Sequence, residues 1–115
     1  LGENQTPILY NDPDLVARAV VSMQTMLGKE NLESVAPMTV SEDFGRYGKT
    51  EEKIPVSIFW LGVVNREAYE KSIREGTILP MLHNPEFYPD FSLSYQTGVS
   101  AMTITCLDVF KTRHP

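Results

Sequence analysis

Residues 54–64 read Ile-Pro-Val-Ser-Ile-Phe-Trp-Leu-Gly-Val-Val, an apolar run without a charged residue. Valine, isoleucine and aromatic residues are enriched in β-strands, and an unbroken run of them is typical of a strand that is buried on both faces. Pro55 stands at the start of the run, and Gly62 predicts a close approach of another backbone near its end. We therefore expect a buried strand here.

A helical pattern precedes this run. Asp12 suits the N-cap and Pro13 the first helical position, and apolar residues then repeat at helical spacing as far as Gly28. This pattern predicts a helix between Asp12 and Gly28, with Met23 and Met26 in the core. Residues 34–40, interrupted by a proline, predict a short edge strand.

Helical patterns also follow the run. Residues 65–75 predict a weak helix with a solvated, charged face. A last helix is expected from Pro89-Asp90 onward, because apolar residues recur there at steps of three and four. These residues are Val99, Met102, Cys106, Val109 and Phe110. The resulting order of helices and strands predicts an α/β fold, a partial sheet of two to four strands packed with helices.

Composition excludes several classes of function. The 115 residues are 42% hydrophobic and 22% charged, an ordinary globular balance. A net charge of -5 without a basic cluster argues against nucleic acid. No apolar run approaches the roughly 18 residues that span a bilayer, so we expect no membrane partner. The single cysteine cannot form an internal disulfide, which leaves the compartment open, with the cytoplasm as our expectation.

His83 lies between a strand-like run and a helix, in Leu79-Pro80-Met81-Leu82-His83-Asn84-Pro85-Glu86-Phe87, and is well placed to bind a metal. A catalytic zinc takes about three protein ligands. The chain has two histidines and one cysteine. His114 suits a helix end, where a cation complements the dipole, and Cys106 fits a helical core position. If His83 binds a metal, most of the other ligands of that metal lie outside this sequence.

A second polar cluster, Ser41-Glu42-Asp43, precedes Phe44. Ser41 can cap a short helix, with Glu42 and Asp43 in its first turn, where the helix dipole favours negative charge. The same residues can instead line a functional site, because capping alone does not require a phenylalanine next to two acids. Both interpretations stay open.

From about residue 7 to residue 110 the chain resembles the C-terminal portion of the catalytic domain of zinc-dependent amidohydrolases and metallopeptidases of the aminoacylase, hippurate hydrolase and carboxypeptidase type. The order and spacing of the matching pieces together carry this resemblance. They are Ile8-Leu9-Tyr10-Asn11-Asp12, Ser41-Glu42-Asp43-Phe44, Ile58-Phe59-Trp60-Leu61-Gly62, Leu82-His83-Asn84-Pro85-Glu86-Phe87 and Gly98.

The resemblance implies that residues 1–115 form a single-domain fragment, the returning C-terminal part of a larger three-layer catalytic domain. His83 would match the last metal ligand, and Ser41, Glu42 and Asp43 an acidic motif lining the same pocket. The catalytic residues and remaining ligands would lie in the N-terminal part. The complete protein would hold one or two divalent metal ions, zinc by expectation, cleave N-acyl amino acids or small peptides, and form a homodimer.

This chain departs from the family pattern at three places. Val56 stands where a glycine usually follows the proline, Asp90-Phe91 where Asp-Glu often starts the final helix, and Thr39-Val40 where a glycine often precedes the acidic motif. These changes leave His83 intact but alter the substrate pocket.

Two other interpretations compete with the active hydrolase. In one, the parent protein is a hydrolase, but the isolated chain is inactive. In the other, the chain is a noncatalytic α/β binding or interaction module, in which His83 is a satisfied polar residue and the acids cap a helix. A common concave pocket for His83 and the Glu42-Asp43 turn would favour the hydrolase over the module.

Overall fold

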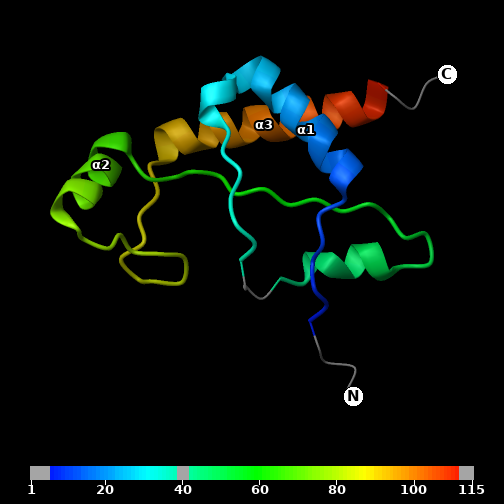
Figure 1. Ribbon diagram of the computed structural model, residues 1–115, viewed down its shortest axis with the longest axis horizontal. Helices are drawn as coiled ribbons and strands as arrows, with labels where there is room; N and C mark the ends of the chain where they lie inside the picture. Colours follow the sequence, from blue (N-terminus) through cyan, green and yellow to red (C-terminus); the bar gives the residue numbers. More distant parts are fainter. Residues whose placement is uncertain (1–5, 39–41, 112–115) are drawn as a thin grey trace. The chain divides into compact units, whose positions relative to one another are not determined.

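The computed structural model of the protein describes residues 6–38 and 42–111 (Figure 1). In this part of the chain three α-helices are joined by extended segments: α1 (Pro13–Leu27), α2 (Arg66–Glu75) and α3 (Phe91–Lys111). Two 3-10 helices, η1 (Lys29–Asn31) and η2 (Phe44–Lys49), lie between α1 and α2 in the sequence. None of the described helices has the length and apolar character needed to cross a bilayer.

The predicted α/β fold is wrong. Helices account for 53% of the described residues, and none of these residues belongs to a β-strand. Residues 54–64 are extended, yet they are not buried on both faces: Val56 is buried, whereas Trp60 is 43% exposed. Gly62 also lacks the predicted close neighbour, because no heavy atom lies within 4 Å of a Cβ placed there.

A side chain takes the place of a neighbouring strand next to this run. Asn11 donates from Nδ2 to the Ile58 carbonyl oxygen at 2.9 Å and accepts from the Ile58 amide at 2.9 Å. The Asp12 amide donates to the Val56 carbonyl at 2.8 Å. A β-ladder requires repeated backbone pairing along two strands, and these contacts bring the two segments together without one.

The second predicted strand is also not found in the described residues. Residues 34–38 are exposed and lie outside any regular element, and Thr39 and Val40 lie outside the described ranges. Pro37 cannot donate a backbone hydrogen bond to a ladder, which is consistent with this result.

The local signals at the ends of α1 are confirmed. Asp12 is the N-cap, and its Oδ1 accepts from the Leu15 amide at 2.9 Å. Pro13 begins the helix, and Gly28 ends it at a φ of 88°, a conformation that side chains rarely adopt. Met23 is buried as predicted, but Met26 is 51% exposed, so only one of the two methionines is in the core.

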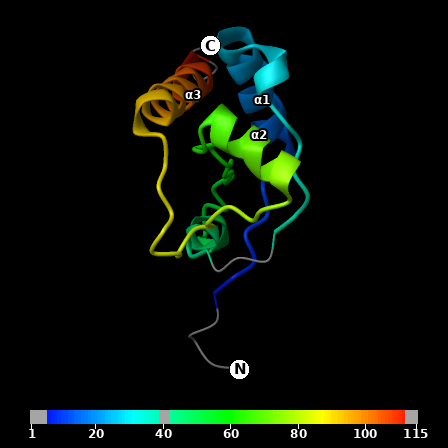
Figure 2. The ribbon, with the colours of Figure 1, turned by 90° about the vertical axis from the view of Figure 1, so that its left-hand side faces the viewer.

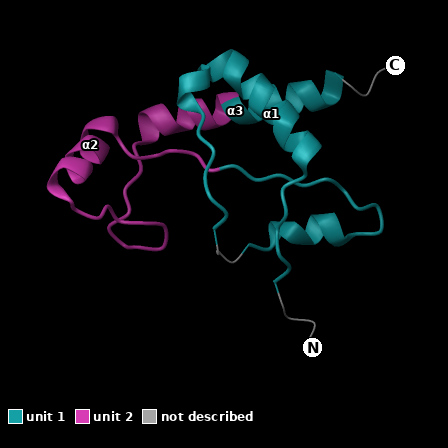
Figure 3. Ribbon diagram, in the orientation of Figure 1, with its two compact units in different colours: residues 1–59, 101–115 teal, residues 60–100 magenta. Residues whose placement is uncertain are grey.

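The chain divides into two compact units (Figure 3), residues 1–59 with 101–115 and residues 60–100. In the first unit, α1 and the C-terminal half of α3 lie side by side (Figures 1 and 2). Its small core consists of Ala19, Met23 and Ala101, with Leu27, Leu32 and Ile104 packed against it.

The second unit contains α2, the loop after it and the start of α3. The Asn65 side chain caps α2 by accepting from the Glu67 amide at 2.9 Å, and Gly76 ends the helix in the left-handed conformation. Asp90 connects the start of α3 with the start of α2, because Asn65 Nδ2 donates to Asp90 Oδ2 at 3.2 Å. Its amide donates to the Val63 carbonyl at 2.7 Å. The contacts of Asp90 hold the C-terminal end of the loop that carries His83 next to the start of α2.

Candidate functional site

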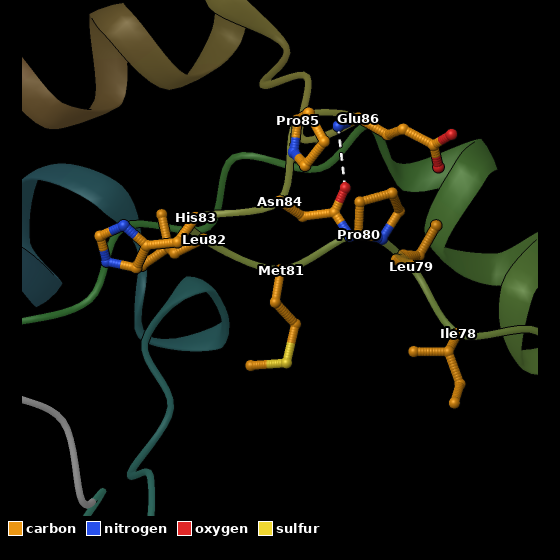
Figure 4. Close-up of a pocket in the computed structure, with 9 residues that line it drawn as sticks. All are labelled: Ile78, Leu79, Pro80, Met81, Leu82, His83, Asn84, Pro85 and Glu86. Atoms are coloured by element: carbon orange, nitrogen blue, oxygen red, sulfur yellow. Dashed lines mark hydrogen bonds between the residues drawn. The ribbon is translucent and has the colours of Figure 1, made fainter.

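The loop between α2 and α3 presents His83 on a turn that Asn84 organises (Figure 4). The Asn84 amide donates to the Met81 carbonyl at 3.1 Å, and its own carbonyl accepts from the Phe87 amide at 3.0 Å. Its side-chain Oδ1 accepts from the Glu86 amide at 2.8 Å. Asparagine commonly forms such side-chain turns, and Pro85 favours a turn at the same place. The local sequence therefore determines how the loop turns at His83.

His83 adopts an uncommon backbone conformation. Its φ is 67°, in the left-handed region, where non-glycine residues are rare and histidine is among those enriched. This conformation costs about 1–2 kcal/mol for a residue with a Cβ. His83 is also exposed to solvent.

The loop forms an open concavity of about 490 Å³. It is lined by the consecutive residues Ile78, Leu79, Pro80, Met81, Leu82, His83, Asn84, Pro85 and Glu86. In Figure 4 the imidazole of His83 and the carboxylate of Glu86 point toward opposite ends of the loop. Glu86 is therefore not a partner of His83 in this arrangement.

The acidic cluster lies before η2. Glu42 Oε1 accepts from the Phe44 amide at 2.8 Å, and the Asp43 carbonyl accepts from the Arg46 amide at 3.0 Å. The carboxylate of Asp43, the N-cap residue, makes no capping hydrogen bond. Ser41 lies outside the described residues. The capping interpretation expected Glu42 and Asp43 in the first turn of a helix capped by Ser41. Instead η2 begins at Phe44 with Asp43 as its N-cap, and its first turn contains no acidic residue. The Asp43 residue is exposed.

His83 and the acidic cluster belong to different units. Glu42 and Asp43 lie in residues 1–59, and His83 lies in residues 60–100. A common pocket for the two clusters stays a prediction.

A complete metal centre is not assembled by the described residues. Within residues 6–38 and 42–111, no three or more histidine, cysteine, aspartate or glutamate side chains gather where they could hold an ion. The exposed imidazole of His83 fits the role of a single ligand. Cys106 is not a core residue as predicted, because its side chain is exposed on α3.

No protein-family model, curated protein or solved structure matches this chain. The resemblance to zinc-dependent amidohydrolases therefore stays a prediction that depends on the short motifs themselves. Sequence reasoning did not single out Asn84 as a site residue, although the Asn-Pro dipeptide at 84–85 is a recognised turn signal.

Proposed function

We propose that this chain is part of a metal-dependent amidohydrolase or peptidase that cleaves N-acyl amino acids or small peptides, and that His83 supplies one metal ligand. The observation that carries the proposal is the left-handed backbone of an exposed histidine, at a φ of 67°. Conformational cost at a single residue is concentrated at functional sites. The turn formed by Asn84 holds His83 in this left-handed conformation despite its cost. This arrangement is consistent with selection for the imidazole of His83.

His83 would bind the metal through the unprotonated nitrogen of its neutral imidazole and donate a hydrogen bond from the other nitrogen to an acceptor that orients the ring. When bound, a divalent ion such as zinc lowers the pKa of a water molecule toward neutrality and so provides the nucleophile for the amide carbonyl. The remaining ligands and the general base belong to another polypeptide segment. By itself, residues 1–115 would then be inactive.

The test compares the complete protein with its His83→Ala variant. We expect His83→Ala to lose metal, measured by elemental analysis, and to lose hydrolysis of N-acyl amino acids. The matched control is His114→Ala, which removes the other histidine of the chain and should retain both properties. Unchanged metal content and turnover in His83→Ala would refute the assignment.

The separate 115-residue chain provides a second test. It should bind zinc weakly and hydrolyse no N-acyl amino acid, because the described residues hold no group of three potential ligands. Substantial turnover by this chain alone would contradict the proposal that its other ligands lie elsewhere.

A noncatalytic binding or interaction module is the second candidate. The contact between Glu42 Oε1 and the Phe44 amide favours it, because this contact gives the Glu42 carboxylate a local structural role. The module interpretation predicts that the complete protein retains its binding partners after His83→Ala. The hydrolase interpretation predicts that the same substitution removes the metal.

A further inference from the structure

The second unit contains a hollow lined by the start of α2, the loop after it and the first turn of α3, which we call the α2–α3 hollow. Its volume is about 460 Å³. All of its lining residues lie between Val64 and Ser92, within the unit of residues 60–100. Small-molecule sites in proteins commonly measure about 300–1,000 Å³, so the hollow has the size of such a site.

The charged residues that line the hollow are all acidic. Glu86 and Asp90 line it, and no lysine, arginine or histidine does. The Asp90 carboxylate is held by uncharged donors, because Oδ2 accepts from Asn65 Nδ2 at 3.2 Å and Oδ1 from the Leu93 amide at 3.4 Å. Glu86 is exposed, and its carboxylate points away from His83 (Figure 4). Two negative charges without a cation in the lining favour a positively charged occupant.

Aromatic rings line the same hollow. Phe87, Tyr88 and Phe91 contribute to it, and Tyr88 and Phe91 are 91% and 72% exposed. The Phe91 ring stacks on Tyr95, with ring centroids 5.3 Å apart and an interplanar angle of 20°, so the next turn of α3 supports it. The face of an aromatic ring attracts a cation, and its apolar surface packs against other rings. The lining therefore suits an occupant that combines a positive charge with an aromatic body.

An organic cation fits this lining better than a metal ion does. A hard metal ion such as calcium takes about six to eight oxygen ligands. Within residues 6–38 and 42–111, no three potential metal-ligating side chains gather at one place. A protonated primary amine, in contrast, has three N–H donors on a compact charge, which two carboxylates can accept.

We propose that the α2–α3 hollow binds a small aromatic molecule that carries a protonated primary amine. The ammonium group donates hydrogen bonds to the carboxylates of Glu86 and Asp90, and the aromatic body lies against Tyr88 and Phe91. This binding uses neither His83 nor a metal ion. The proposal is therefore independent of the proposed hydrolase function.

The test measures the affinity of the complete protein for phenethylamine, which is protonated at neutral pH, by ligand-observed nuclear magnetic resonance titration. Phenethyl alcohol is the matched ligand, because it has the same aromatic body and no charge. We expect the amine to bind about 5- to 10-fold more tightly, as for one partly exposed ion pair with a cation–π contact. Equal affinities, or no binding of the amine, would overturn the proposal.

Variants of exposed residues locate the binding. Glu86→Gln keeps the size of the side chain and should weaken amine binding about 5-fold, without an effect on the alcohol. Glu75→Gln, at the exposed end of α2 and outside the lining, is its control. Tyr88→Ala should weaken both ligands, whereas Tyr69→Ala, an exposed tyrosine of α2 outside the lining, should weaken neither. Wild-type affinity for the amine in both Glu86→Gln and Tyr88→Ala would refute this placement.

Two further arms separate the proposal from its alternatives. N-acetyl-lysine amide carries the same ammonium on an aliphatic stem, as a lysine of another protein would. Tighter binding of this compound than of phenethylamine would overturn the aromatic amine as the occupant. Amine selectivity together with unchanged metal in His83→Ala would mean that the proposed function fails while the amine site stands. Metal loss in His83→Ala together with equal affinities for amine and alcohol would mean the reverse.

Discussion

Arg18 on α1 and Asp108 on α3 form a three-way contact within the first unit. Arg18 donates to Asp108 Oδ2 from Nε at 3.1 Å and from Nη2 at 2.9 Å, and Nη2 also donates to the Asp108 carbonyl at 3.0 Å. The two residues are 90 positions apart in the sequence. Their side chains are 39% and 34% exposed, so solvent screening reduces the strength of the ion pair.

Arg18→Lys should destabilise the first unit. A lysine ammonium has no planar fork and does not reproduce the three hydrogen bonds of the guanidinium. We expect a loss of about 0.5–1 kcal/mol in the free energy of unfolding, measured by urea denaturation with circular dichroism. Arg74→Lys, an exposed residue of α2, is the matched control. Equal effects of the two substitutions would contradict the structural role of the Arg18 contact.

Asn11→Ala should expose the Ile58 backbone. Both polar atoms of the Asn11 amide are hydrogen-bonded to Ile58, so the substitution leaves its N–H and carbonyl without these partners. We expect the Ile58 amide to exchange with deuterium about 10-fold faster, as for one lost hydrogen bond in a partly buried site. Nuclear magnetic resonance measures this rate. Asn31→Ala removes an exposed contact to the Leu27 carbonyl and should leave Ile58 exchange unchanged.

His83→Gly should be more stable than His83→Ala by about 1 kcal/mol, because glycine adopts a positive φ without the steric cost that alanine keeps. Urea unfolding followed by the fluorescence of Trp60, the single tryptophan, measures the difference in the same unit. At Leu82, whose φ is not positive, the order should reverse, with alanine more stable than glycine. The same order at both positions would show that His83 is not strained.

Glu52 should titrate below the ordinary range of a glutamate. Hydrogen bonds from its own backbone and from the Thr50 side chain lower the pKa of its carboxyl group. A lowered pKa in the folded state favours folding above the unfolded-state pKa, and this contribution is lost as the pH falls through the folded-state pKa. Thr50→Val should raise the pKa of Glu52, measured by a carbon-13 titration of its carboxyl group.

The Thr50 hydroxyl has one proton and two acceptors. It also lies 3.2 Å from the Tyr47 carbonyl oxygen, to which it donates. An ionised carboxylate is a stronger acceptor than a backbone carbonyl. Ionised Glu52 therefore attracts the hydroxyl proton of Thr50 more strongly than the Tyr47 carbonyl does. Thr25→Val removes a hydroxyl that donates to the Val21 carbonyl and should leave the pKa of Glu52 unchanged. An unchanged pKa in Thr50→Val would mean that the Tyr47 carbonyl keeps the proton.

The helices could be predicted from sequence because their signals are local. Asp12, Pro13 and Gly28 act within one turn of the ends of α1, and Pro89-Asp90 act in the same way at the start of α3. The sheet was predicted wrongly because strand pairing depends on segments far apart in the chain. Residues 54–64 have the composition of a strand, but the group that meets Ile58 is the side chain of Asn11.

The candidate site shows the same limit. The turn at His83 follows from Asn84 and Pro85 next to it, so its position in a loop between two elements could be anticipated. The side of α3 that faces outward could not be anticipated from the sequence. A regular apolar spacing identifies an apolar face of a helix but does not show what covers that face. The relation between His83 and Glu42 depends on two separate units and is likewise beyond local sequence patterns.

The Asn11 amide has a consequence for solubility. An extended, uncharged, apolar segment such as residues 54–64 is a template on which strands of other molecules can add and start a fibril. Asn11 occupies the N–H and carbonyl of Ile58 that such an incoming strand would need, and Pro55 offers no N–H at the start of the segment. At Ile58, one amide side chain therefore occupies the backbone groups to which another strand would have to bind.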